Sequence, residues 1–98
     1  MSSMAKYRMA TVVAATPALA GAAGSRQLMG FLLFGGSLAS QVEFKDAASD
    51  TGTVLLGANV IAVDTKFVDL TSFGGVPFGT GLFVKPAGTG AIVYVWYE

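Results

Sequence analysis

The last twenty residues show the clearest pattern of apolar positions in the chain. They predict a strand over Leu82–Lys85, a tight turn over Pro86–Gly90 and a terminal strand over Ala91–Tyr97. Both alternate sets of the terminal strand are apolar: Ile92, Tyr94 and Trp96 on one side, Val93, Val95 and Tyr97 on the other. A strand at a solvated surface alternates apolar with polar residues. We therefore expect both faces of this strand to be covered.

A second apolar run, Gln27–Phe34, is short for a helix and stops at Gly35-Gly36. These features favour a fully buried strand over a buried helical segment. Gly30, inside the run, predicts a bend or the close approach of another backbone. The segment Gln41–Asp46 alternates polar with apolar residues and predicts a half-exposed strand.

The rest of the chain is divided by turn residues into further short segments. They are strands at Arg8–Ala15, Thr53–Leu56 and Lys66–Leu70, a connection or weak edge strand at Ala18–Gly24, a turn at Ala47–Gly52, a loop or brief strand at Gly57–Val63, and a glycine-rich loop or bulged edge at Ser72–Phe78. Spacing near ten residues and the absence of an amphipathic helix predict an all-β fold. We expect a small jelly-roll-like or Ig-like sandwich of about seven or eight antiparallel strands.

Aromatic residues are expected to fill the space between the two sheets. They are Phe31, Phe34, Phe44, Phe67, Phe73, Phe78, Phe83, Tyr94 and Trp96.

The N-terminal residues 1–8 are predicted to form an extended arm before a single domain over residues 9–98. Lys6 and Arg8, followed by an apolar stretch and Ala18-Leu19-Ala20, resemble a signal peptide with its cleavage site. We favour the arm, followed by a first strand that ends at Thr16-Pro17.

Charged residues make up 12% of the chain, about half of the roughly 25% usual in soluble domains. A small domain has a large surface for its volume, so this deficit indicates either a membrane protein or a subunit of an assembly. A membrane helix needs about 20 unbroken apolar residues. The uncharged runs are shorter and broken by Gly, Pro, Ser or Gln, which favours the assembly.

Several functional classes are disfavoured by the residue content. The net charge is zero and the six basic residues are spread singly, so we expect no binding to nucleic acid. The chain has no His and no Cys, the usual metal ligands and nucleophiles. The carboxylates fall at turns, on outward strand positions or at the terminus, and the Gly-Thr-Gly triplets at Gly79 and Gly88 lack the residues of a phosphate loop. We expect no enzyme, no cofactor and no metal site.

Several motifs together resemble small virion proteins of tailed bacteriophages. They are the L-x-G-F run, V-E-F-K-D before a Thr/Gly turn, and the closing P-F-G-T-G-L-F-V-K-P and G-A-I-V-Y-V-W-Y, within about Leu28–Tyr97. The resemblance implies a sandwich that trimerises and cements the outside of an icosahedral capsid, with the major capsid protein as its partner and the virion surface as its location. No functional residue is carried over, because that family has no catalytic motif.

The residues expected to form interfaces are Tyr7, Arg8, Phe31, Phe34, Phe73, Phe78, Tyr94, Trp96 and Tyr97. The arm and two glycine-rich loops, Gly35–Ser40 and Ser72–Gly81, are expected to contact the shell, because loops adapt to a curved lattice. Two alternatives remain. One is a tail, head–tail connector or spike component. The other is a carbohydrate-binding module in which Tyr94 and Trp96 stack on a sugar.

Overall fold

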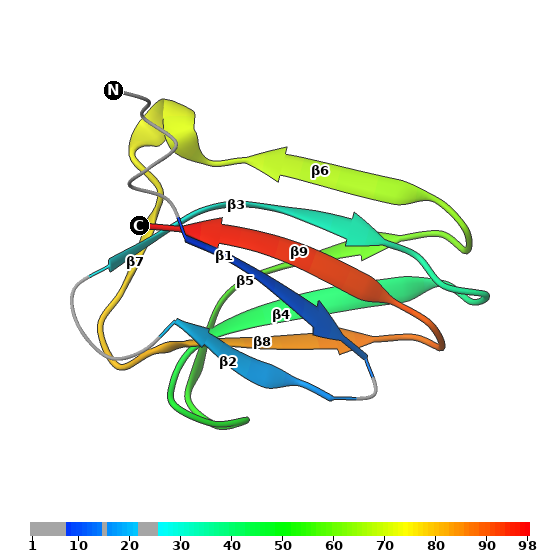
Figure 1. The fold of residues 1–98 in the computed structure, drawn as a ribbon, viewed down its shortest axis with the longest axis horizontal. Helices are drawn as coiled ribbons and strands as arrows, with labels where there is room; N and C mark the ends of the chain where they lie inside the picture. Colours follow the sequence, from blue (N-terminus) through cyan, green and yellow to red (C-terminus); the bar gives the residue numbers. More distant parts are fainter. Residues whose placement is uncertain (1–7, 15, 22–25) are drawn as a thin grey trace.

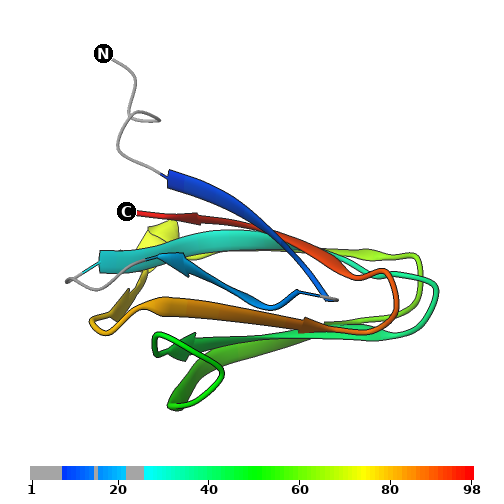
Figure 2. The same cartoon turned by 60° about the horizontal axis from the view of Figure 1, so that its bottom comes forward.

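A computed structural model of the chain describes residues 8–14, 16–21 and 26–98. Within these residues, nine strands form two antiparallel sheets that stack as layers (Figures 1 and 2). Sheet A has the order β1 (Arg8–Val13), β9 (Ile92–Tyr97), β3 (Arg26–Phe34) and β6 (Thr65–Asp69), and the short β7 (Val76–Phe78) also pairs with β3. Sheet B has the order β2 (Ala18–Gly21), β8 (Leu82–Ala87), β4 (Ser40–Asp46) and β5 (Thr53–Val60). A 3-10 turn occupies Thr71–Phe73.

The pairing of the strands makes the sandwich a jelly roll. With β7 set aside, the first of eight strands pairs with the last, the second with the seventh, the third with the sixth and the fourth with the fifth. The pairs β9–β3 and β8–β4 then join these four ladders into two sheets. This is the eight-strand, double Greek-key arrangement. The prediction of an all-β sandwich is confirmed, and of the two topologies expected the strand order is the jelly roll.

The core lies between the sheets and is built from alternate residues of their central strands. It includes Leu28, Phe31 and Leu33 of β3 and Val93 and Val95 of β9, all fully buried. Sheet B contributes Val42, Phe44, Leu82 and Val84. The rings of Phe31 and Phe44 meet across the layers with centroids 4.6 Å apart, so aromatic contact ties the two sheets together.

Gly30 has both of the features predicted for it. The ladder between β3 and β9 changes register between Leu28 and Gly30, which marks a bulge. A side chain at Gly30 would also stand 2.8 Å from the backbone oxygen of Val68 and 2.6 Å from the Trp96 ring. The prediction of a strand rather than a helix over Gln27–Phe34 is confirmed by β3.

Two strands extend beyond their predicted ends at Lys85 and Leu56. The turn assigned to Pro86–Gly90 begins later, because β8 continues to Ala87 and Pro86 pairs with Val42 of β4. Pro86 is tolerated there because β2, on the other side of β8, pairs no further than Val84. The ambiguous segment Gly57–Val63 continues β5 as far as Val60, in register with β4.

The connections divide between two ends of the sandwich (Figure 1). The turns β1–β2, β3–β4, β5–β6 and β8–β9 gather at one end, called here the turn end. The connection from β6 through β7 to β8 and the C-terminus lie at the other. The predicted arm lies outside the described residues apart from Arg8, which begins β1.

The expectation that all nine aromatic residues fill the space between the sheets is wrong for five of them. Phe31, Phe44 and Phe78 do lie in the core. Phe83, between the core residues Leu82 and Val84, is buried on the outer side of β8. The other four are Phe34, Phe67, Tyr94 and Trp96, which the strand register places on the outer face of sheet A. Phe73 lies in the 3-10 turn, and its side chain is outside the described part of the chain.

Candidate interaction surface

The outer face of sheet A is covered by apolar side chains arranged in rows across the strands. The first row runs Val13, Ile92, Phe34; the second Thr11, Tyr94, Leu32, Phe67; the third Met9, Trp96, Gly30. Strand β6 adds Thr65 to the end of the first row and Asp69 to the end of the third, at the edge of the sheet. We call the ten other residues of these rows the apolar face. Met9 and Phe67, at its two edges, keep 65% and 61% of their surface exposed, while Leu32, Ile92, Tyr94 and Trp96 are half-buried.

Ring contacts hold the aromatic side chains of the apolar face in place. Phe67 and Trp96 are stacked with centroids 5.5 Å apart and planes 27° apart. Phe34 and Tyr94 meet edge to face at the same centroid distance. Trp96 also lies over Gly30, where the lack of a side chain leaves room for its ring. These contacts reduce the freedom of the aromatic residues before any partner binds.

The outer face of sheet B has the opposite character. The central strands β4 and β8 place Glu43 opposite Lys85, and Gln41 pairs with Asn59 of β5. The Asp50 carboxylate, from the β4–β5 turn, binds Lys45 at 2.7 Å and Lys85 at 2.9 Å. Hydrogen bonds from these two lysines lower the pKa of Asp50. Only sheet A therefore presents an aromatic outer surface, with the carboxylate of Asp69 at its β6 edge.

Asp46 acts as a structural clamp between β4 and the start of β8. Its carboxylate accepts backbone N–H hydrogen bonds from Gly79 at 3.1 Å, Thr80 at 2.7 Å and Gly81 at 3.3 Å. These bonds, that from Thr80 above all, lower the pKa of Asp46. Asp69 likewise accepts bonds from the Thr71 N–H and hydroxyl, and its pKa is lowered by them. Asp46 and Asp69 therefore each have a local structural role.

The turn end carries a second group of exposed apolar side chains. Leu38 of the β3–β4 turn is 60% exposed, and Ile61 and Val63 of the β5–β6 turn are 70% and 86% exposed. Val63 also has a positive φ of 51°, a strained conformation for a β-branched residue.

Backbone hydrogen bonds make the turn end a single unit. The β3–β4 turn is bonded to the β5–β6 turn between Gly35 N–H and Asp64 O at 2.8 Å, and to the β8–β9 turn between Ser37 N–H and Thr89 O at 3.0 Å. Ala14, just after β1, donates to Ala91 at 3.0 Å. The exposed apolar residues Leu38, Ile61 and Val63 therefore lie on turns that are hydrogen-bonded to one another.

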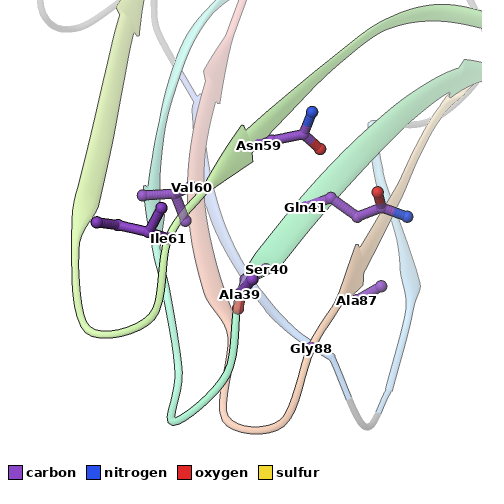
Figure 3. Close-up of a pocket in the computed structure, with 8 residues that line it drawn as sticks. All are labelled: Ala39, Ser40, Gln41, Asn59, Val60, Ile61, Ala87 and Gly88. Atoms are coloured by element: carbon purple, nitrogen blue, oxygen red, sulfur yellow. The ribbon is translucent and has the colours of Figure 1, made fainter.

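A shallow hollow of about 480 Å³ lies beside the turn end, on sheet B (Figure 3). Ser40, Gln41, Asn59, Ile61 and Ala87 are among the residues that line it, and Figure 3 shows the two amide side chains rising from the neighbouring strands β4 and β5. Its lining includes no ionisable side chain. The hollow therefore offers no group for general acid–base chemistry.

The residues predicted to form interfaces are separated by the fold. Phe34, Tyr94 and Trp96 lie together on the apolar face. Phe31, Phe78 and Tyr97 are buried between the sheets. Arg8 is exposed at the start of β1 but pairs with Tyr97, so it does not belong to the apolar face. Tyr7 and the Phe73 side chain lie outside what the structure describes.

The predicted interface residues leave out seven members of the apolar face: Met9, Thr11, Val13, Gly30, Leu32, Phe67 and Ile92. A usable signal existed for Phe67, which alternates with Thr65 and Asp69 on the same side of its strand. Polar neighbours at period two indicate a side that faces outward. No such signal marks Leu32 or Ile92, because their strands are apolar on both sides.

In the described part of the chain, no group of acidic residues is placed to hold a metal ion, and no helix could cross a membrane. Comparisons with protein-family models, with curated proteins and with solved structures find no significant match to this chain.

Proposed function

We propose that this chain is a non-enzymatic structural protein that decorates and cements the shell of a tailed-phage capsid. The observation that carries the proposal is the asymmetry of the sandwich. The outer face of sheet A is aromatic, with Asp69 at its edge, whereas that of sheet B carries Glu43, Lys45 and Lys85 with Asp50. A contiguous apolar surface on a small domain marks a contact site. The jelly roll is an architecture that capsid proteins use, although a fold alone does not determine function.

The two glycine-rich loops expected to contact the shell lie at opposite ends of the sandwich (Figure 1). A molecule that stands on the shell by one end presents only one of these loops to it. The turn end is the better choice, because its exposed Leu38, Ile61 and Val63 offer apolar contacts on turns that are bonded to one another. In this proposal the turn end faces the major capsid protein and the chains gather about a local three-fold axis.

A cement protein acts by mass action: it binds the assembled shell more tightly than the dissociated subunits and so stabilises the shell. The chemistry required is contact area rather than reactive groups. The low content of charged residues in the whole chain agrees with a surface that is largely buried in an assembly.

The test uses purified tailed-phage particles whose genome encodes this chain, stripped of it and then mixed with the recombinant protein. We expect the protein to sediment with the particles in many copies spread over the shell and to raise the temperature at which they release DNA. Ile61→Glu should weaken this binding, whereas Val54→Glu, on the outer side of β5, should not. Absence of the protein from the particles, or a single ring of it at one vertex, would contradict the proposal.

A further inference from the structure

We infer that the apolar face is a self-association surface, on which the same face of further copies of this chain packs. The inference rests on the proposed function in one respect: it names the partner that binds to one surface of the decorating protein. Its evidence is the distribution of charge and apolar side chains over the two sheets and their edges.

The first argument is complementarity. No member of the apolar face is ionised, and the neighbouring carboxylate, Asp69, lies at the β6 edge, where it accepts hydrogen bonds from Thr71. If the partner is another copy, sheet B is a poor match, because its outer face carries Glu43, Lys45 and Lys85 with Asp50. Burying those groups against aromatic rings would remove their hydration without providing new partners. Like faces therefore meet like faces, about a symmetry axis.

The second argument is net charge. The chain carries six basic and six acidic residues, so its formal net charge is zero. Copies of the chain do not repel one another at long range, unlike those of a strongly charged domain.

The third argument concerns the edges of sheet A. Lys66 of β6 pairs with the core residue Leu33 and so points to the inner side, yet it is exposed at the sheet edge. An inward-pointing charge on an edge strand is a known barrier to edge-to-edge pairing. Copies are therefore directed to stack by their faces rather than to extend the sheet at β6.

The size of the face sets the expected strength. Four strands of about six residues cover roughly 20 Å by 19 Å, or about 400 Å², from the usual rise and spacing of strands. That is the size of a functional patch on a monomer. It is also about half of the roughly 800 Å² per partner in a standard interface, so we expect weak, concentration-dependent association.

The test is sedimentation velocity of the recombinant chain from about 1 µM to about 500 µM, the range in which weak complexes form. We expect the mass to rise from 10.0 kDa towards two or three times that value. Thr11→Glu and Phe67→Glu add a charge at exposed positions of the apolar face and should keep the chain monomeric. Val54→Glu adds the same charge on the sheet B side and should associate like the wild type.

Trp96 gives a second readout, because it is the only tryptophan of the chain and lies on the apolar face. Its emission should shift to the blue and its quenching by acrylamide should fall as the protein concentration rises, but not in Thr11→Glu. Circular dichroism melts establish that each variant is folded. A wild-type chain that stays monomeric over the whole range, or folded face variants that associate as it does, would overturn the inference.

The outcomes separate this inference from the proposed function. A chain that self-associates but does not bind particles contradicts capsid decoration and leaves the inference standing. A monomeric chain whose Trp96 emission shifts only when particles are added assigns the apolar face to another protein and overturns the inference.

Discussion

The indole ring of Trp96 lies over Gly30, its register partner on the neighbouring strand. A methyl group added at Gly30 would come within 2.6 Å of the ring and 2.8 Å of the Val68 carbonyl oxygen. The contact joins the bulge of β3 to the aromatic residues of the apolar face, because Trp96 also stacks on Phe67. Gly30 is therefore required for the arrangement of the surface as well as for the strand.

We expect Gly30→Ala to destabilise the domain by about 1–3 kcal/mol, the usual cost of overpacking. The Trp96 ring must move, so its fluorescence should change in the folded state as well. Gly79→Ala is the matched control, since nothing lies within 4 Å of a methyl group there. Urea unfolding followed by circular dichroism measures both variants, and equal losses of stability would show that crowding at Gly30 is unimportant.

We expect a larger loss of stability from a substitution at Gly36, which lies in the turn end. A methyl group there would overlap the Thr89 backbone oxygen, and a backbone cannot move aside as a side chain can. We expect Gly36→Ala to cost about 3 kcal/mol or more, at the upper end for steric insertions. Hydrogen exchange should also become faster at Ser37 and Val63, whose N–H groups bond across the turns. Unchanged exchange rates at both amides would contradict the claim that hydrogen bonds between the turns stabilise the turn end.

The sequence predicts those features of the structure that depend on residues close together along the chain, and not those that depend on distant residues. Alternation identified the strand at Gln41–Asp46, with Val42 and Phe44 facing inward, because that pattern is local. Pairing is not local, so the choice between jelly-roll and Ig-like order needed the ladders themselves. The predicted strand end before Pro86 is wrong for the same reason, since the place of Pro86 in β8 depends on where the pairing with β2 ends.

The apolar face was likewise predictable only in part. Period two separated Tyr94 and Trp96 from Val93 and Val95, but both sets are apolar and nothing local indicated which one faces the core. The structure places the smaller, β-branched residues between the sheets and the large rings outside. The predicted interface residues Phe31 and Phe78 are aromatic residues in apolar segments, a property that core residues share.

The strain at Val63 predicts a substitution that stabilises the protein. Val63 has a φ of 51° and is 86% exposed, so its side chain contributes little burial to offset an unfavourable backbone conformation. Val63→Asn places there a residue that tolerates the left-handed region, and we expect a gain of about 1 kcal/mol. A thermal melt with Val54→Asn as the exposed control measures it. A lower melting temperature for Val63→Asn would indicate that the valine makes a contact worth more than its strain.

Acid should weaken the clamp that Asp46 makes on the start of β8. Because its backbone hydrogen bonds lower the pKa of Asp46 in the folded state, the carboxylate contributes stability that is fully present above its unfolded pKa, near 4. That contribution is lost as the pH falls through the lower folded value, where the group takes up a proton. At pH 7, Asp46→Ala should therefore melt below the wild type. The difference between the two proteins should shrink as the pH falls below about 4. Melting curves of both proteins at a series of pH values test this, and a difference that stays constant down to pH values near 2 would show that ionisation of Asp46 does not stabilise the clamp.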